Sequence, residues 1–183
     1  MSTMRIPESI TGSAGAPSGA HRRSVAQICS RWPENRPGPS LERISALCEL
    51  LGSPQHAAPV IQITGTNGKG STAIIIDSLL RAMGLRTGRF TSPHLQDISE
   101  RICIDGRPIS SARFDDIWHQ IESMVAMVDE QQLGGIAMTF FEVMTGMAFA
   151  AFADAPVDVM VMEVGMGGRW DATNVADASV AVG

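Results

Sequence analysis

A glycine-rich turn that carries a lysine follows a short apolar segment in residues 60–72, which read VIQITGTNGKGST. Its glycines have no Cβ, so the backbone can wrap closely around an anion and point successive N–H groups at it. A helix that begins after the turn would add the positive end of its dipole. The turn therefore predicts a cradle for nucleotide phosphates, formed by Gly65, Thr66, Asn67, Gly68, Lys69, Gly70, Ser71 and Thr72.

Lys69 would neutralise the β- and γ-phosphates of the nucleotide, and the hydroxyl of Ser71 or Thr72 could bind Mg²⁺. The strict phosphate-loop pattern G-x-x-x-x-G-K-[ST] is not met, because Ile63 stands where its first glycine belongs and Gly70 follows the lysine. This departure argues against a general NTPase. The alternative is a plain strand-to-helix turn with a solvated lysine.

An acidic residue ends a second apolar segment, residues 157–163, and another glycine-rich loop follows it. A carboxylate buried without a partner is costly, so Glu163 must meet a metal ion, an arginine or water. Mg²⁺ prefers one or two carboxylates together with phosphate oxygens, which predicts Glu163 as a magnesium ligand. The alternative is a structural ion pair with Arg169. Three polar residues farther along could equally be turn formers that bond their own backbone: Asp171, Thr173 and Asn174.

The elements that must position these motifs follow from apolar periodicity and turn residues. Strands are expected at residues 60–63, 157–163 and 178–182, and residues 84–90 are expected to form a turn and a further strand. A hairpin is expected in 101–109 around Asp105-Gly106. Helices are expected at residues 73–83, which should be mostly buried, at 112–128 after Ser110 or Ser111 as the N-cap, and at 139–153 in the interior. This alternation favours an α/β fold with a doubly wound, mostly parallel sheet flanked by helices.

The N-terminal part has a different composition. Residues 1–23 are rich in Ser, Gly, Ala and Pro and are expected to be a disordered extension, with a transit peptide as the alternative. A short helix is expected over residues 24–32, with His21 in a loop before it. Ser40 is expected as the N-cap of a second helix through Leu51, whose apolar face belongs to the core. Residues 24–183 would then form one domain.

Composition restricts the function further. The chain has 183 residues, 44% of them hydrophobic and 18% charged, which suffices for one core. A net charge of −5 gives no basic footprint for nucleic acid, and no apolar run reaches the roughly 20 residues that span a membrane. Cys29, Cys48 and Cys103 are expected to be reduced, buried thiols. Small-molecule partners, a monomer and a cytoplasmic location are expected.

Four segments together resemble folylpolyglutamate synthase and dihydrofolate synthase of the Mur-ligase superfamily: residues 61–71, 90–95 with Glu100-Arg101, 139–142 and 163–174. The likeness begins near Arg31 and explains the departure from the strict phosphate-loop pattern. It implies a P-loop-type, ATP-binding domain that uses ATP and Mg²⁺. ATP would phosphorylate a carboxylate of folate or dihydropteroate, and the amino group of L-glutamate would attack the resulting acyl phosphate.

The resemblance also implies roles for individual residues. Lys69 becomes the catalytic cation, and Ser92 joins Glu163 and Ser71 as a magnesium ligand. Trp170 departs from a small or aliphatic residue, and its indole would either stack on the pterin or crowd it. The implied substrate-binding positions are Gly38, Pro39, Ser40, Leu41, Thr139, Phe140, Phe141, Glu142, Arg169, Trp170, Asp171 and Ala172.

The resemblance implies further parts that residues 1–183 do not contain, namely a histidine magnesium ligand, a carbamylated lysine and a C-terminal α/β domain. The last expected strand also has no covering helix, so an incomplete chain with weak or absent ligase activity of its own is expected. Two other classes stay open. One is a nucleotide-binding module without turnover, and the other is a Mur ligase of peptidoglycan synthesis.

Overall fold

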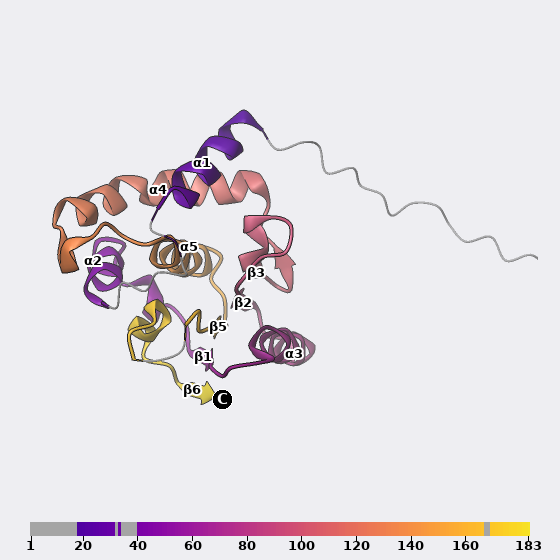
Figure 1. Cartoon of the computed structure of the whole chain (residues 1–183). Coiled ribbons are helices and arrows are strands. Elements are labelled where there is room, and N and C mark those ends of the chain that lie inside the picture. The colour runs from indigo at the N-terminus through magenta and orange to yellow at the C-terminus, as the bar shows by residue number, and fades with distance from the viewer. Residues whose placement is uncertain (1–17, 32, 34–39, 167–168) are drawn as a thin grey trace, which may run out of the picture.

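The computed structural model describes residues 18–31, 33, 40–166 and 169–183. Its centre is a six-stranded sheet in the order β4-β3-β2-β5-β1-β6 (Figure 1). Four strands are parallel, and two form an antiparallel hairpin at one end. The bounds are β1 Val60–Ile63, β2 Thr87–Phe90, β3 Ile102–Ile104, β4 Arg107–Pro108, β5 Val159–Glu163 and β6 Val180–Val182. The expected mostly parallel α/β sheet is confirmed.

Strand β5 is central because its near-continuous apolar run buries both faces. All five of its residues are buried, and it pairs in parallel with β1 on one side and with β2 on the other. Ile63 lies opposite Glu163, and Phe90 lies opposite Met162. The loops that follow β1, β2 and β5 therefore leave the sheet at the same edge, where α/β sheets bind ligands.

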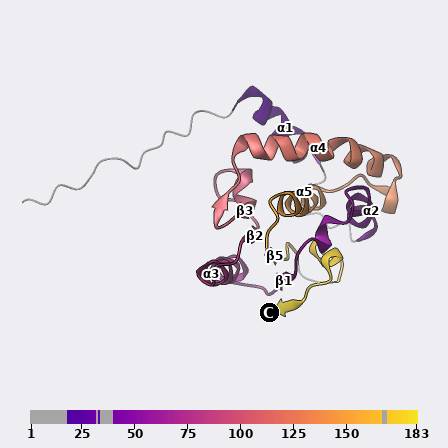
Figure 2. The same ribbon diagram turned by 180° about the vertical axis from the view of Figure 1, so that it is seen from behind.

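The helices cover the two faces of the sheet unequally. Figures 1 and 2 show α5 with α2, α4 and α1 on one side, and α3 on the other. Their bounds are α1 Gly19–Cys29, α2 Glu42–Leu50, α3 Lys69–Ala82, α4 Ser111–Glu130 and α5 Phe140–Asp154. Short 3₁₀ helices complete the described chain: η1 Pro54–His56, η2 Ile98–Arg101, η3 Leu133–Gly135 and η4 Ala172–Ala176. Almost every residue of α5 is buried, so the expected interior helix is confirmed.

The expectation of a mostly buried helix after the glycine-rich turn is wrong. In α3 only Ala73 and Asp77 are buried, although the helix is apolar on most of its surface. Ile75 and Leu79 are 58% and 60% exposed. The physical reason is that, within the described residues, α3 lies alone on its face of the sheet and touches it along one side (Figure 1).

The N-terminal expectations also need correction. Helix α1 begins at Gly19, where the Ser18 side chain accepts a hydrogen bond from the His21 N–H at 3.0 Å, so residues 18–23 are not an extension. His21 is buried in this helix, with Nδ1 2.9 Å from Asp115 Oδ1 on α4. Packing on α4 outweighs the weak local helix signal. Residues 1–17 lie outside the described residues.

Two smaller expectations differ as well. The N-cap of α2 is Leu41, and the Ser40 hydroxyl accepts the Glu42 N–H at 3.1 Å without capping the helix. Cys48 and Cys103 are buried free thiols, and burial raises the pKa of Cys48 to about 12. Cys29 is exposed, because α1 lies on the outer surface and Cys29 is its last residue.

Candidate active site

The glycine-rich turn connects β1 to α3. Gly65 and Gly68 have φ values of +125° and +76°, which L side chains rarely adopt, so glycine is required at both positions. Gly68 is the N-cap of α3, and no side chain caps the helix there. The first N–H groups of α3 therefore point outward without a side-chain acceptor, which is the arrangement that binds phosphate at helix N-termini.

Lys69 is the first residue of α3, and it is the only lysine in the sequence. Its Nζ donates a hydrogen bond to the Gly65 carbonyl at 3.0 Å. This contact folds the side chain back across the turn. The ammonium is held over the glycines, on the side of the loop where the helix N-terminus begins.

Glu163 lies at the end of β5 and is 3% exposed. Its Oε2 accepts the Ser92 N–H at 3.0 Å, and a Cβ built on Gly70 would lie 3.6 Å from the same oxygen. Burial raises the pKa of Glu163, while the Ser92 N–H and the positive charges of Lys69, Arg101 and Arg89 act in the opposite direction. The structure thus brings the carboxylate against the first turn of α3 and the loop after β2.

The partners of Glu163 allow its two sequence interpretations to be compared. No lysine, arginine or histidine nitrogen in the described part of the chain lies within 4 Å of its carboxylate, so the ion pair with Arg169 is not formed. A buried carboxylate with one N–H donor, beside a turn suited to phosphate, fits a magnesium ion. Residues 18–31, 33, 40–166 and 169–183 contain no group of three His, Cys, Asp or Glu side chains that could by itself hold a metal ion. Hydroxyls, water and phosphate oxygens would complete such a site.

The loop that carries Ser92 is fixed by residues just downstream of it. The Glu100 carboxylate accepts the N–H groups of Leu95, Gln96 and Asp97 at 2.9, 3.2 and 3.0 Å. These backbone hydrogen bonds, first that of Leu95, lower the pKa of Glu100. The Ser92–Pro93 peptide bond is cis. The D-x-x-E spacing of Asp97 and Glu100 is a capping box that signals this anchor in the sequence, although our sequence analysis missed it.

Arg101 joins this loop to the start of α5. Its Nε donates to His94 Nδ1 at 2.9 Å, and its guanidinium lies 4.9 Å from the centre of the Phe140 ring. Arg101 is 3% exposed and contributes to the positive potential at Glu163. The loop after β2 and the aromatic start of α5 are therefore held together next to the carboxylate.

The side chains of Thr139 and Glu142 form hydrogen bonds with other groups inside the fold. Thr139 caps α5 by accepting the Glu142 N–H at 3.2 Å, and Glu142 Oε2 accepts the Thr139 N–H at 2.7 Å. Buried Arg43 donates from Nε to both Glu142 carboxylate oxygens, at 3.1 and 3.0 Å. Arg43 is not signalled by any local motif, and its only mark in the sequence is its place next to Ile44 at the start of the apolar face of α2.

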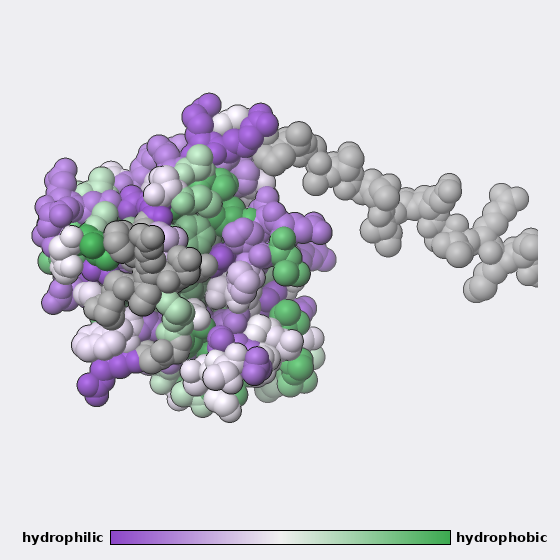
Figure 3. Space-filling view, in the orientation of Figure 1, coloured by the Kyte–Doolittle hydropathy of each residue, from purple (hydrophilic) through white to green (hydrophobic). Residues whose placement is uncertain are grey.

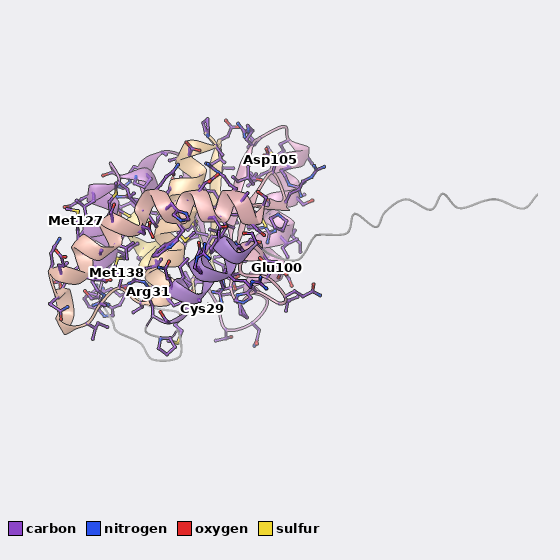
Figure 4. All side chains as sticks on the ribbon, turned by 90° about the horizontal axis from the view of Figure 1, so that it is seen from above. Cys29, Arg31, Glu100, Asp105, Met127 and Met138 are labelled. Atoms are coloured by element: carbon purple, nitrogen blue, oxygen red, sulfur yellow. The ribbon has the colours of Figure 1, made fainter. Side chains whose placement is uncertain are left out.

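A second arginine fixes the segment that enters α5. Arg31 Nη1 donates to the Met138 carbonyl at 3.2 Å and to Asp129 Oδ2 at 2.9 Å. Figure 4 shows Arg31 and Met138 close together at the end of α1. Asp129 also accepts the Met138 N–H at 2.7 Å. The N-terminus of α5 is thus anchored to α1 and α4.

The aromatic and loop residues expected to bind substrate occupy different environments. Phe140 is buried, and Phe141 packs on Phe90 with ring centres 5.6 Å apart. Trp170 is 57% exposed, and Arg169 is exposed beside it. Ala172 is buried, Ser40 and Leu41 are half-buried before α2, and Gly38 and Pro39 lie outside the described residues.

Asp171 organises the loop after β5. It accepts the Thr173 N–H at 3.0 Å and the Met166 N–H at 3.1 Å, and burial raises its pKa. Asp171 and Thr173 are therefore turn formers, as the simpler interpretation of this loop predicts. Gln62 on β1 donates from Nε2 to Thr173 Oγ1 at 2.9 Å and to Asn174 Oδ1 at 2.7 Å, which ties this turn to the sheet.

Known proteins resemble this arrangement in sequence and in structure. A dihydrofolate synthase/folylpolyglutamate synthase of Mycobacterium tuberculosis is 62% identical to the chain, over 83% of the chain and 32% of that protein. The folylpolyglutamate synthase of M. tuberculosis complexed with ADP superimposes with a TM-score of 0.84 at 57% identity. The chain belongs with the folylpolyglutamate and dihydrofolate synthases. The resemblance inferred from its motifs is confirmed.

The matches cover most of this chain but only part of each known synthase. The M. tuberculosis superposition covers 88% of this chain but 36% of the synthase. An FPGS–AMPPCP–folate complex superimposes with a TM-score of 0.80 at 37% identity, over 88% of this chain and 39% of that one. The match thus spans about a third of the length of the synthases of M. tuberculosis, Bacillus subtilis and Escherichia coli. No protein-family model matches it.

Proposed function

We propose that this chain forms the ATP- and magnesium-binding part of a ligase that joins L-glutamate to the carboxylate of folate or dihydropteroate. The observation that carries the proposal is the position of Glu163, buried against Gly70 and Ser92 beside a turn whose N–H groups point outward. Named relatives make or extend folates, and their solved complexes contain ADP, AMPPCP and folate.

The proposed reaction has two steps. A carboxylate oxygen of the folate attacks the γ-phosphorus of ATP, the bond to the β–γ bridging oxygen breaks, and ADP leaves. The glutamate amine then attacks the acyl carbon, loses a proton, and expels phosphate to leave an amide. Lys69 and the first N–H groups of α3 would hold the phosphates and offset the charge that develops on the transferred group.

Magnesium would be held by Glu163, with the hydroxyls of Ser92 and Ser71 as further oxygen ligands. When bound, it would neutralise phosphate charge and align the γ-phosphoryl group. Ser71 is exposed in the first turn of α3, and Ser92 is held next to Glu163 by its own N–H. Both serines therefore belong to the segments that the metal would join.

On the substrate side we propose two kinds of contribution. Trp170 and Arg169, which are exposed in the loop after β5, would contact the folate directly, and Ser40, Leu41 and Ala172 would border it. Thr139 and Glu142 would act by fixing the start of α5, which places Phe140 and Phe141. By the resemblance to the synthases, Gly38 and Pro39 would also border the folate.

A nucleotide-binding module without turnover is the second candidate, because the chain spans about a third of the relatives it matches. The two candidates separate when the chain is incubated with ATP, Mg²⁺, labelled L-glutamate, and dihydropteroate or tetrahydrofolate. Amide product with ADP supports the ligase, whereas nucleotide binding without product supports the module. Absence of both contradicts the proposal. Preferential binding of a UDP-muramyl acid over dihydropteroate would indicate a Mur ligase.

The remaining part of the proposal concerns partners, location and oligomeric state. No helix in the described ranges has the length and apolar character needed to cross a bilayer. We propose that the chain acts as a monomer in the cytoplasm on small-molecule substrates.

A further inference from the structure

The side chain of Gln62 leaves β1 on the face of the sheet opposite to α3. Successive residues of a strand point to opposite faces, and its neighbour Ile63 packs in the small apolar cluster beneath α3. Gln62 therefore points to the other face, where its half-buried amide donates to Thr173 at 2.9 Å and to Asn174 at 2.7 Å. Both acceptors belong to η4, in the loop that follows β5.

This loop carries the exposed Trp170 and is closed on itself by the next residue. Asp171 accepts the Thr173 N–H at 3.0 Å and the Thr173 hydroxyl at 2.6 Å. A hydroxyl has one proton to donate and two lone pairs to accept with. Thr173 therefore gives its proton to Asp171 and accepts from Gln62, so one chain of hydrogen bonds runs from β1 to the residue beside Trp170.

Apolar packing and these hydrogen bonds fix different properties of the loop. Ala172 and Ala176 are buried in the core, which holds η4 against the molecule, but apolar contact has no preferred direction. Hydrogen bonds depend on angle, so the amide of Gln62 can fix the way the loop faces. Figure 3 shows hydrophilic and hydrophobic residues side by side around η4 and β6, a mixture that suits a ligand with an apolar ring and a charged end.

The other end of this connection is the phosphate turn. The Ile63 carbonyl accepts the N–H of the residue after β5 at 2.9 Å, and the Thr64 N–H donates to the last carbonyl of β6 at 2.8 Å. The chain from Gln62 to the turn is therefore held by a neighbouring strand on each side. Gly65, which opens the turn, is three residues from Gln62, a span of at most about 11 Å.

We infer that Gln62 is a positioning residue, which holds the loop of Arg169 and Trp170 at a fixed place relative to the phosphate turn. This inference rests on the proposed function, in which that loop contacts folate and the turn holds ATP. The folate carboxylate must approach the γ-phosphorus to within about 3–3.5 Å, and a displacement of about 1 Å disturbs such an approach. An amide nitrogen suits this task, because its two protons reach two acceptors without adding charge to the site.

Gln62→Met tests the inference, because methionine keeps the length of the side chain and lacks both donors. Affinity for dihydropteroate and tetrahydrofolate, measured by titration calorimetry, should fall about tenfold, as expected for the loss of one or two hydrogen bonds. Affinity for an ATP analogue should stay within about twofold, because neighbouring strands still hold the residues before the turn. A purely structural role of Gln62 would lower both affinities together.

Gln132→Met is the matched control. Gln132 is exposed after α4, and its amide donates to the carbonyl of Asp129 at 2.9 Å, within the same turn of chain. Both affinities should stay as in wild type.

Thr173 offers a second pair of variants at the other end of the bond. Thr173→Val keeps the shape of the side chain without its hydroxyl, so folate affinity should fall as in Gln62→Met. Thr173→Ser keeps the hydroxyl, so folate affinity should stay within about threefold of wild type. This pair decides the question in the same way if Gln62→Met does not fold.

Trp170 reports on the loop without any ligand. Its fluorescence anisotropy decay is isolated by subtracting the signal of the same protein with Trp170→Phe. In Gln62→Met the indole should move through a wider angle on the nanosecond timescale than in wild type. Gln132→Met should leave this motion unchanged.

The outcomes separate this inference from the proposed function. Equal folate affinity of wild type and Gln62→Met, an equal loss of folate and nucleotide affinity, or unchanged motion of Trp170 would overturn the role of Gln62 and leave the proposed function in place. A wild-type chain that binds the ATP analogue but neither folate would overturn the substrate side of the proposed function and this inference with it. Selective loss of folate affinity together with wider motion of Trp170 supports the inference.

Discussion

Two buried carboxylates, Glu142 and Glu163, differ in what surrounds them. They are 4% and 3% exposed; Glu142 lies in the first turn of α5, and Glu163 ends β5. Glu142 accepts hydrogen bonds from the Thr139 N–H and from Arg43, which supplies a full positive charge. Glu163 accepts one bond, from the Ser92 N–H, and has no ion-pair partner within the described ranges. The exposed fraction therefore does not distinguish the roles of these two carboxylates, whereas their hydrogen-bond and ion-pair partners do.

This difference separates a structural region from one prepared for a ligand. At the start of α5 the Glu142 carboxylate, the Thr139 N–H and the Arg43 guanidinium all bond other groups of the chain. At the carboxyl edge of β5 a carboxylate and a set of helix N–H groups lie side by side with few partners in the chain. A magnesium-bound phosphate would supply opposite charges to both. Substitutions at the start of α5 should therefore change folding stability, and substitutions at the carboxyl edge of β5 should change nucleotide binding.

The largest effect is expected from Arg43→Met. It leaves the Glu142 carboxylate buried without its cation, which costs about 3–5 kcal/mol of folding free energy. Denaturant unfolding measures this loss. Arg86→Met is the matched control, because the exposed Arg86–Asp105 pair at 3.5 Å should contribute about 1 kcal/mol or less. A loss below about 1 kcal/mol for Arg43→Met would show that Glu142 does not need this partner.

A smaller effect, on binding and not on folding, is expected from Lys69→Ala. A charge-assisted bond contributes about 1.5–3 kcal/mol, so affinity for an ATP analogue should fall about 10- to 100-fold. Unfolding free energy should stay within about 0.5 kcal/mol, since the side chain is partly exposed and bonds only the Gly65 carbonyl. Isothermal titration and thermal unfolding measure the two quantities.

The sequence offers a second measurement at the same residue. Lys69 is the only lysine, so an amine-acylating reagent can modify only this side chain and the N-terminus. Bound ATP should slow acylation of Lys69 and leave acylation of the N-terminus unchanged, as read by mass spectrometry. Equal protection of both amines, or of neither, would argue against phosphate contact by Lys69.

Glu163→Gln should have effects of opposite sign on binding and stability. The ratio of nucleotide affinities with Mg²⁺ and with EDTA should fall towards one, because the variant lacks the charge that attracts the ion. Burial raises the pKa of Glu163, so the folded state favours the neutral form. The stabilising effect of protonation is then present at low pH and is lost as pH rises through the raised pKa. The glutamine variant should therefore gain stability relative to wild type as pH rises above about 4.3, the ordinary glutamate value.

Glu142→Gln is the matched variant at the other carboxylate. It leaves the Arg43 charge buried without its counter-charge, so stability should fall at pH 7 while the magnesium ratio stays unchanged. Both variants keep side-chain volume, remove one negative charge and replace one acceptor oxygen with an amide donor. If the two glutamine variants shift stability in the same direction, the comparison between the two regions fails.

How far the sequence could predict these regions depends on where the partners lie. The strand, the turn and the helix from Val60 to Ala82 are local, and glycine placement with apolar periodicity predicts them. Arg43 and Glu142 are 99 residues apart, and His21 and Asp115 are 94 apart. No local pattern signals such pairs. The exposure of α3 was also unpredictable, since apolar residues on a helix do not say whether another element covers them.

The smallest effect is expected at the loop that presents Ser92. Glu100 accepts the N–H groups of Leu95, Gln96 and Asp97, and these bonds lower its pKa. A lowered pKa means that the contribution to stability is present above about pH 4.3, the ordinary glutamate value, and is lost as pH falls through the folded value. Glu100→Gln replaces one acceptor oxygen with an amide donor, so it should lower stability at pH 7 and converge with wild type below pH 4.

Hydrogen exchange gives the residue-level reading of this change. The amides of Leu95, Gln96 and Asp97 should lose protection in Glu100→Gln, whereas Glu130→Gln, an exposed change at the end of α4, should leave them as in wild type. Because Ser92 lies on the same loop, affinity for magnesium-bound nucleotide should fall less than in Glu163→Gln. Unchanged exchange at these amides would mean that Arg101, through His94 and Phe140, holds the loop by itself.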